Sequence, residues 1–323
     1  MSELILAVDG GNAKTDLALV SAAGELLALV RGPGSSPHEH GLDGALDRIE
    51  ALLAEVHRDG ELAIADLSLA GVDFPHEVER ARERIVERGW ARRVEVGNDT
   101  QALLRAGTDR GWGVAIVCGA GVNCAAVGPD GTQVRFPALG ETTGDWGGGY
   151  DLGRAAVFAA ARSEDGRGPR TALEHSVPAF FGCPSVLAVA EAIHLGELPR
   201  RRLTELAPLV LAEAASDAAA AEIVARQAAE VVAFARVALE RIGTLPEPAE
   251  VLLGGGILRA RDPRLLGAVE AGLAPSGAIV KVVDAPPVLG AALLGLDRLG
   301  ASPEARARLR RELDPVPAEV HHG

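Results

Sequence analysis

The chain has 323 residues, enough for two lobes of ordinary domain size. Its formal net charge is −13, which argues against nucleic acid as the main partner, because a phosphate backbone needs a basic protein surface. Aromatic residues make up only 3% of the chain, so alanine, valine and leucine must fill the core.

The first hundred residues predict strands alternating with helices. We expect strands at about 4–8, 17–20, 25–30, 63–70 and 94–96, and helices at about 42–56, 78–86 and 101–106. A loop rich in Gly, Pro and Ser at 31–37 separates the third strand from the first helix. This pattern predicts an N-terminal lobe at 1–108 with the order βββαβαβα.

The remaining residues, 109–323, predict a second lobe that opens in the same way. We expect strands at about 112–121, 123–128, 132–136, 250–253 and 279–283. The glycine-dense stretch 138–153 suits neither strand nor helix, and an alanine-rich helical insertion is expected at about 154–243. We expect the helix at about 286–300 to pack back on the first lobe, and Ser302-Pro303-Glu304 predicts a short terminal helix. The chain therefore reads as an α/β layered fold.

The cysteine pattern and the absence of long apolar segments indicate in which cellular compartment the protein is expected. Cys118, Cys124 and Cys183 form no C-x-x-C pair and no even-numbered disulfide framework. The N-terminus lacks a charged segment followed by a long apolar stretch, and no segment approaches ~18 consecutive apolar residues. We therefore expect a reduced, cytoplasmic protein that does not bind a membrane.

A strand–turn–strand pattern rich in glycine occurs twice. The first strand leads into Asp9-Gly10-Gly11-Asn12-Ala13-Lys14-Thr15, and a later strand leads into Cys118-Gly119-Ala120-Gly121-Val122-Asn123. Glycine lets main-chain N–H groups approach phosphate oxygens closely, because no Cβ atom stands in the way. Two such hairpins would clamp a polyphosphate, so the repeat predicts an ATP-using enzyme of two similar lobes.

A third glycine cluster, Leu253-Gly254-Gly255-Gly256, and the pair Asn98-Asp99 complete a recognisable order of motifs. Over about residues 4–300 the chain resembles the actin/hexokinase/Hsp70 type of ATPase, a ribonuclease H-like fold. Within it, the chain resembles the BadF/BadG/BcrA/BcrD family, which includes N-acetylglucosamine kinases. The resemblance implies a duplicated two-lobed fold, ATP and Mg²⁺ as cofactors, an amino sugar as substrate and a homodimer.

The glycine clusters are the expected nucleotide-binding residues. They comprise Gly10, Gly11, Asn12, Lys14, Thr15, Gly119, Ala120, Gly121, Gly254, Gly255 and Gly256. Asp9 ends a buried strand beside the expected phosphates, where a bridging Mg²⁺ would offset its charge; alternatively it accepts hydrogen bonds from turn amides. Lys14 either adds a cation for the phosphates or points into solvent.

Asp99 follows the strand at 94–96, where crevices form in α/β sheets. A hydroxyl that attacks a γ-phosphate needs an acceptor for its proton, and Asp99 matches the family's catalytic aspartate in that role. The alternative is that Asp99 is the N-cap of the helix that begins near Gln101.

The family resemblance also implies a set of sugar-binding positions. They are Ser35, Ser36 and His38 after the third strand, Asn123 in the second hairpin, and Gly140, Glu141 and Asp145 in the glycine-dense stretch. Asp145 binds either a sugar hydroxyl or hydrated Mg²⁺, and Asn123 is alternatively a left-handed turn residue. Serine at 35 and 36, where the family often has asparagine, leaves the acceptor open between N-acetylglucosamine at O6 and glucosamine. An ATPase that activates a dehydratase or reductase is the other hypothesis, although the cysteines lack the pattern of an iron–sulfur site.

Overall fold

The computed structural model describes residues 3–57 and 62–313, which form two compact units. Of the described residues, one unit contains 3–57, 62–115 and 283–313, and the other contains 116–282. The chain passes from the first unit to the second inside strand β6 (Gly113–Cys118), and residues 283–313 belong to the first unit again.

The first unit is built on a five-stranded sheet in the order β3-β2-β1-β4-β5. Its strands are β1 (Leu4–Gly10), β2 (Lys14–Ser21), β3 (Leu26–Pro33), β4 (Leu62–Leu69) and β5 (Ala91–Gly97). β1 pairs with β2 in antiparallel and with β4 in parallel orientation, and β4 pairs with β5 in parallel. The carboxyl ends of β1, β4 and β5 therefore meet at one edge of the sheet, the usual place for a ligand in α/β folds.

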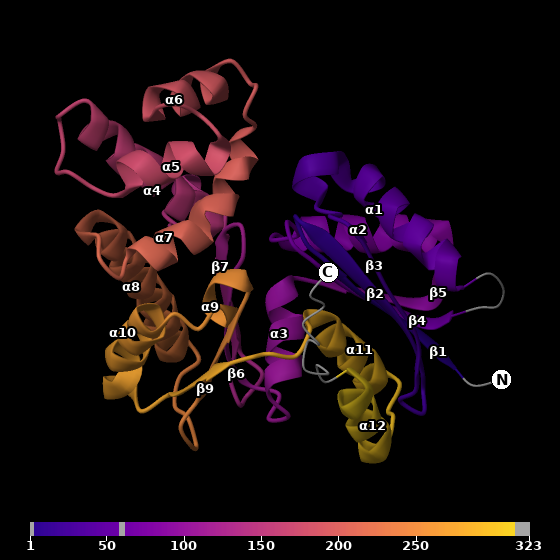
Figure 1. Cartoon of the computed structure of the whole chain (residues 1–323). Coiled ribbons are helices and arrows are strands. Elements are labelled where there is room, and N and C mark those ends of the chain that lie inside the picture. The colour runs from indigo at the N-terminus through magenta and orange to yellow at the C-terminus, as the bar shows by residue number, and fades with distance from the viewer. Residues whose placement is uncertain (1–2, 58–61, 314–323) are drawn as a thin grey trace. The chain divides into compact units, whose positions relative to one another are not determined.

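Helices cover both faces of this sheet (Figure 1). Leu6 and Val8 face α1 (Pro37–Val56) and α2 (Pro75–Arg88), while Ile5 and Ala7 face α11 (Pro287–Arg298). This alternation follows from the two-residue period of a strand and explains why the first five residues of β1, Leu4 to Val8, are all apolar. The unit is completed by α3 (Asp99–Gly107) and α12 (Pro303–Leu313). The element order matches the predicted βββαβαβα, although α1 begins at Pro37, earlier than predicted, and contains a kink at Gly41.

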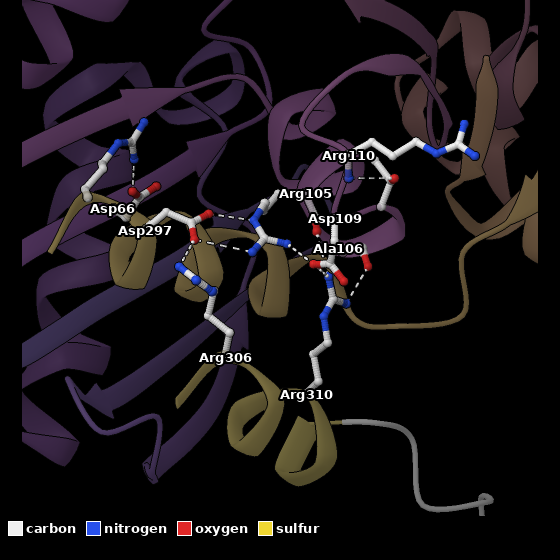
Figure 2. A network of polar contacts seen from close by, with 10 residues as sticks. Asp66, Arg105, Ala106, Asp109, Arg110, Asp297, Arg306 and Arg310 are labelled. Atoms are coloured by element: carbon white, nitrogen blue, oxygen red, sulfur yellow. Dashed lines mark hydrogen bonds and ion pairs between the residues drawn. The ribbon is translucent and has the colours of Figure 1, made fainter. Parts of the chain in front are cut away.

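Polar contacts tie the C-terminal end of α3 to α11 and α12 (Figure 2). Arg105 Nε donates to Asp297 Oδ2 at 2.6 Å, and Arg306 Nη1 contacts the same carboxylate at 3.0 Å. Arg310 Nη1 donates to the carbonyl oxygen of Ala106 at 2.8 Å. Cations favour the C-terminal end of a helix, because its last carbonyls have no partner within the helix. α12 therefore caps α3.

The Arg310→Met variant should lose about 1–2 kcal/mol of unfolding free energy, because it removes the charged donor from the end of α3. Urea denaturation measures the change. Arg308→Met is the matched control on the same helix, since Arg308 pairs only with exposed acidic side chains and its loss should matter far less. Equal effects of the two substitutions would contradict the capping role.

The second unit repeats the topology of the first. Its sheet order, read from the other edge, is β8-β7-β6-β9-β10, which corresponds strand for strand to β3-β2-β1-β4-β5. The remaining strands are β7 (Val122–Val127), β8 (Gln133–Arg135), β9 (Glu250–Gly254) and β10 (Ile279–Val282). β7 pairs with β8 in antiparallel and β9 with β10 in parallel orientation, as in the first unit. The predicted duplicated fold is confirmed.

The helical insertion lies between β8 and β9. It contains the 3₁₀ helix η1 (Gly140–Thr143), α4 (Gly148–Glu164), α5 (Leu173–Phe181), α6 (Val186–His194), η2 (Arg200–Leu206), α7 (Ala207–Glu213) and α8 (Ala218–Arg241). After β9 come α9 (Gly256–Arg259) and α10 (Pro263–Leu273). The prediction that the stretch up to 153 holds no helix is wrong, because α4 begins at Gly148 and η1 precedes it.

Membrane-spanning potential is confined to one pair of helices in the described part of the chain. No single helix there is both long and apolar enough to cross a membrane. α5 and α6, which are bent by 48° relative to each other, pass that test of length and composition only when they are taken together.

Candidate functional site

Asp99 is the first residue of α3, directly after the carboxyl end of β5. Asn98, not Asp99, is the N-cap of this helix: its Oδ1 accepts a hydrogen bond from the Thr100 N–H at 3.1 Å. The alternative of a capping role for Asp99 is therefore wrong. Asp99 Oδ1 is buried and has no hydrogen-bond partner among the described residues. A buried carboxylate oxygen without a partner is costly, so it points to a ligand.

Asp73 lies beside Asp99 at the same edge of the sheet. Asn98 Nδ2 donates to Asp73 Oδ1 at 2.9 Å, which brings the residues that follow β4 against those that follow β5. Burial and the negative charge of Asp73 raise the pKa of Asp99 from 3.8 to about 6. The ideal general base has a pKa close to the working pH, so this environment suits proton transfer.

Hydrogen bonds of buried hydroxyl groups support the first glycine turn. Thr15 Oγ1 lies 2.8 Å from both the Pro33 carbonyl oxygen and Ser35 Oγ, and the Ser35 N–H donates to the Gly11 carbonyl at 3.1 Å. Thr15 and Ser35 are both fully buried. These two residues support the turn, and their contact with a ligand stays a prediction. Gly10 is fixed by packing, since a Cβ atom there would lie 2.7 Å from Ser35 Oγ.

Ser36 offers a second unsatisfied group in the first unit. Its side chain is fully buried, and its Oγ atom makes no hydrogen bond within the described chain. It occupies the N-cap position of α1 without capping it. A Cβ atom on Gly71 would lie 3.2 Å from both Ser36 Oγ and His38 Nδ1, so these side chains crowd the loop after β4. Among the predicted sugar-binding residues, Ser36 is the best placed to accept a new partner.

Asp9 and Asp16 form a cross-strand pair of acidic residues on β1 and β2, both buried. Lys14 pairs with Asp16, and Arg31 Nε donates to it at 2.6 Å. Burial alone raises the pKa of Asp16, but Arg31 and Lys14 outweigh it and leave the pKa below 3.8. Asp9 adds to the field that raises the pKa of Arg31. Lys14 is thus paired with Asp16 beside the first turn, and its side chain is 41% exposed.

The second glycine turn keeps main-chain donors open. The N–H groups of Ala120 and Gly121 have no acceptor in the part of the chain that the structure describes. A Cβ atom on Gly119 or Gly121 would meet no protein atom within 4 Å, and neither residue has a positive φ. The fold itself therefore does not require glycine at these two positions. Open space beside free N–H groups is what a phosphate-binding turn needs.

The third glycine cluster is of mixed character. Gly255 has φ +86°, and a Cβ atom there would lie 2.2 Å from the Cys118 carbonyl oxygen, so packing against β6 demands glycine. A Cβ atom on Gly256 would meet nothing within 4 Å. Gly254 is the last, buried residue of β9.

The Gly121→Ala variant should keep its unfolding free energy within about 0.5 kcal/mol of the wild type, because the added methyl meets no protein atom. If the turn holds phosphates, the same methyl should raise KM for ATP by about tenfold or more. Gly255→Ala is the control: it should lower stability by about 2 kcal/mol or more, because its Cβ meets a backbone carbonyl at positive φ. An unchanged KM for ATP in Gly121→Ala would contradict the phosphate role.

A pocket of about 350 Å³ lies beside this turn, entirely within the second unit. It is lined by Ala120, Gly121, Val122, Ala138, Gly140, Asp145, Gly147, Tyr150, Asp151, Arg201 and Thr204. The N–H groups of Gly149 and Tyr150 donate to the carbonyl oxygens of Gly119 and Ala120 at 2.8 and 2.9 Å. The start of α4 is therefore fixed to the turn, which explains how a helix can begin among glycines. The volume of the pocket lies in the range of small-molecule sites.

Of the acidic residues predicted in this region, Asp145 is the best placed to contact a ligand in the pocket. It is 7% exposed, lines the pocket and accepts a hydrogen bond from Thr143 Oγ1. Glu141 instead has an exposed side chain that pairs with Arg154, and it does not line the pocket. Contact of Glu141 with the sugar stays a prediction. Asn123 is half-buried on β7.

Arg201 and Thr204 of the pocket wall were not predicted. They come from η2, which approaches α4 at two glycines one turn apart: Cβ atoms on Gly149 and Gly153 would lie 3.0 and 1.9 Å from carbonyl oxygens of η2. The sequence signal for this contact was the pair of glycines four residues apart in a helix. Arg201 carries an exposed guanidinium without an ion-pair or hydrogen-bond partner among the described residues.

Metal-binding potential is limited in each unit. The described residues contain no group of three or more His, Cys, Asp or Glu side chains that could hold an ion by themselves. Mg²⁺ usually takes only one or two protein carboxylates and completes its shell with water and phosphate oxygens. Asp9 and Asp145, each buried at the end of a strand or loop, fit that lesser demand.

Comparison with known proteins gives consistent results. The model of the BadF/BadG/BcrA/BcrD ATPase family matches residues 6–295. An N-acetylmuramic acid/N-acetylglucosamine kinase from Clostridium acetobutylicum is 23% identical over 265 residues, which cover 79% of this chain and 85% of that protein.

Solved structures show the same fold. A proposed N-acetylglucosamine kinase from Chromobacterium violaceum matches with a TM-score of 0.72 and 25% identity, covering 91% of this chain and 99% of that chain. A ROK family glucokinase from Streptomyces griseus, solved with glucose and AMPPNP, matches with a TM-score of 0.57 over 91% of this chain and 99% of its own. At 18% identity, the second likeness concerns the fold alone.

Proposed function

Because this chain belongs to the BadF/BadG/BcrA/BcrD ATPase family, we propose that it is an ATP-dependent carbohydrate kinase that phosphorylates an amino sugar. The first candidate acceptor is N-acetylglucosamine at its 6-hydroxyl. The observation that carries the proposal is the buried, unpartnered Oδ1 of Asp99 at the carboxyl edge of the first sheet.

Asp99 is the proposed general base. Its unpartnered oxygen would accept a hydrogen bond from the acceptor hydroxyl and aim that oxygen for in-line attack. As the new ester bond forms, the hydroxyl proton passes to the carboxylate. A pKa of about 6 leaves the group ionised at neutral pH yet basic enough to take the proton. Ser36 Oγ, buried without a partner, is a second group available to the sugar in the first unit.

The glycine turns fit the phosphates of a nucleotide. When bound, ATP with Mg²⁺ supplies the γ-phosphoryl group and a divalent charge that offsets the phosphate oxygens. The free N–H groups of Ala120 and Gly121 would donate to phosphate oxygens, and Lys14, held by Asp16, adds positive charge at the first turn. Asp9 is the proposed ligand of Mg²⁺, and Asp145 is a ligand of either the ion or a sugar hydroxyl.

The family resemblance further suggests a cytoplasmic homodimer, and we include both properties in the proposal. The three cysteines are free thiols, and burial raises the pKa of Cys118 and of Cys124, so neither is poised to react. Light scattering coupled to size-exclusion chromatography tests the dimer.

A coupled ADP-release assay tests the kinase. Mg·ATP is supplied with N-acetylglucosamine, glucosamine, N-acetylmannosamine or glucose, and the wild type is compared with Asp99→Asn. Sugar-dependent ADP release that the substitution abolishes is the expected result. Turnover independent of any sugar, together with iron in the purified protein, would favour the ATPase that activates a dehydratase or reductase instead.

Arg201 favours a second candidate acceptor, an amino sugar with an acidic substituent. Its guanidinium forms no ion pair or hydrogen bond among the described residues and interacts only at longer range with the charge of Glu205. It lines the same pocket as Asp145, where a neutral sugar would give it no anionic partner. N-acetylmuramic acid, named for the Clostridium acetobutylicum relative, differs from N-acetylglucosamine by a lactyl ether that ends in a carboxylate.

The Arg201→Met variant should raise KM for N-acetylmuramic acid by about tenfold to a hundredfold, because a charged hydrogen bond is lost. KM for N-acetylglucosamine should change little, since that sugar has no carboxylate. Arg200→Met, a neighbour that does not line the pocket, is the control. Equal effects on both sugars would remove the second candidate.

A further inference from the structure

A second pocket, of about 300 Å³, lies in the helical insertion on the side of α4 that faces α8. It is lined by Trp146, Ala155, Phe158, Ala159, Arg162, Pro169, Ala219, Glu222, Ile223 and Arg226. Figure 1 shows the helices of the insertion that supply these residues. None of them lines the pocket beside the second glycine turn, so the two pockets are separate.

Two guanidinium–aromatic pairs define the chemistry of this pocket. Arg226 lies over the ring of Trp146, 4.1 Å from its centroid, and Arg162 lies 5.5 Å from the centroid of Phe158. Phe158 is 65% exposed, far more than an aromatic ring that serves only the core. Stacking occupies the faces of a guanidinium but leaves the N–H groups at its edge available for an acceptor.

The charge and the volume of this pocket limit the class of ligand that it can bind. The lining contains two arginines and one glutamate, Glu222. Arg226 forms only a long ion pair with Glu230, 3.9 Å from its Nε atom and without a hydrogen bond, while Arg162 donates to the Arg167 carbonyl at 2.7 Å. Alanines at 155, 159 and 219 leave room for a flat apolar body. A volume near 300 Å³ lies at the lower end of the range for small-molecule sites and suits a single ring with one acidic group.

We propose that this pocket, the insertion pocket, binds a small organic anion with a flat apolar body. Arg226 pairs with its acidic group, and Phe158 and the alanines receive its ring. The insertion pocket is joined to the site by neighbouring residues: Trp146 follows Asp145, and Arg226 precedes Gln227. The Gln227 Oε1 atom accepts the Gly148 N–H at 2.7 Å at the start of α4.

Ligand binding in the insertion pocket therefore holds the loop that carries Asp145. An anion that fixes Arg226 over Trp146 restricts one side of this loop, and Gln227 already restrains the other. Less conformational freedom is then lost when the acceptor sugar binds, so the ligand should lower KM for the sugar. This coupling, unlike the binding itself, rests on the proposed kinase activity.

Calorimetric titration of the full chain with phenyl phosphate tests the binding. Saturable binding is expected, and it should be at least about tenfold weaker for inorganic phosphate and for neutral benzyl alcohol. Two variants should each weaken the binding of phenyl phosphate by about tenfold or more. Ala159→Leu fills the pocket from a half-buried helix position, and Arg226→Gln removes the charge. Binding that survives Ala159→Leu, or no saturable binding of phenyl phosphate, overturns the proposal.

Two comparisons separate the test of ligand binding from the test of its coupling to sugar phosphorylation. Phenyl phosphate should bind equally well in Gly121→Ala, since Gly121 does not line the insertion pocket; weakening there would place the ligand in the phosphate turn and overturn the proposal. In the sugar assay, Ala159→Leu should retain basal turnover but lose the decrease in KM caused by phenyl phosphate. A chain without any sugar kinase activity would refute the proposed function and leave the binding result standing.

Discussion

The Asp99→Asn variant is expected to lose sugar phosphorylation by about 10²–10⁴-fold, the usual contribution of a positioned general base. The amide keeps the shape of the side chain and can still accept a hydrogen bond from the acceptor hydroxyl, but it cannot take the proton. KM for the sugar should therefore change less than kcat. In the wild type, kcat/KM should fall below about pH 6, where the carboxyl of Asp99 becomes protonated. This acidic limb should be absent from the residual activity of the variant.

The same substitution should stabilise the fold at neutral and alkaline pH. The pKa of Asp99 is about 6 in the folded chain and near 3.8 in the unfolded chain, so ionisation disfavours folding. The penalty is absent below about pH 4, grows as the pH rises to about 6 and is constant above it. A shift of about two pKa units corresponds to about 3 kcal/mol, which is the largest gain expected for Asp99→Asn at pH 8.

Urea denaturation at pH 4 and pH 8 measures this difference. Asp16→Asn is the matched control, because the pKa of Asp16 is lowered by Arg31 and Lys14 despite its burial. That variant should lose stability at pH 8, and the loss should shrink as the pH falls and the wild-type carboxylate is protonated. If Asp99→Asn were less stable than the wild type at pH 8, the picture of Asp99 as a strained, unpartnered group would be wrong.

The parts of the fold that the sequence predicted depend on local signals. Both glycine turns follow apolar strands, so the duplication was visible in the chain itself, and the strand order of the second unit repeats that of the first. Asp99 could be placed at the edge of the sheet because it directly follows a strand, β5. The choice between base and N-cap could not be made, since Asn98 and Asp99 are both good N-cap residues and only geometry separates them.

The parts that the sequence did not predict depend on long-range contacts. Glycine disfavours helix, yet α4 begins at Gly148 because carbonyl oxygens of the second hairpin accept the first N–H groups of the helix. Arg201 reaches the pocket because η2 packs against glycines of α4. In sequence it belongs to a run of three arginines, a pattern that more often marks a solvated surface. The C-terminal helix α12 was predicted, but the hydrogen bond from Arg310 to the last turn of α3 joins residues 204 positions apart.

Gly290→Val should be among the most destabilising single substitutions in the first unit. A Cβ atom at Gly290 of α11 would lie 1.9 Å from the carbonyl oxygen of Ala102 and 2.5 Å from its carbonyl carbon, so two helix backbones would have to separate. Over-packing against a side chain typically costs about 1–3 kcal/mol, and a rigid backbone cannot yield as a side chain does. We therefore expect a loss of at least about 3 kcal/mol, measured by urea denaturation.

A helical glycine with no neighbouring atoms provides a control in which the substitution should raise stability instead of lowering it. Gly267 of α10 has no atom within 4 Å of a built Cβ, so Gly267→Ala should gain up to about 1 kcal/mol from helix propensity alone. Gly290→Ala, the smaller change at the critical position, should already lose stability, and any folded fraction should have a raised KM for the sugar because α3 carries Asp99. If Gly290→Ala instead gained stability as Gly267→Ala does, the close contact of α11 with α3 would be refuted, and with it the idea that this contact positions the general base.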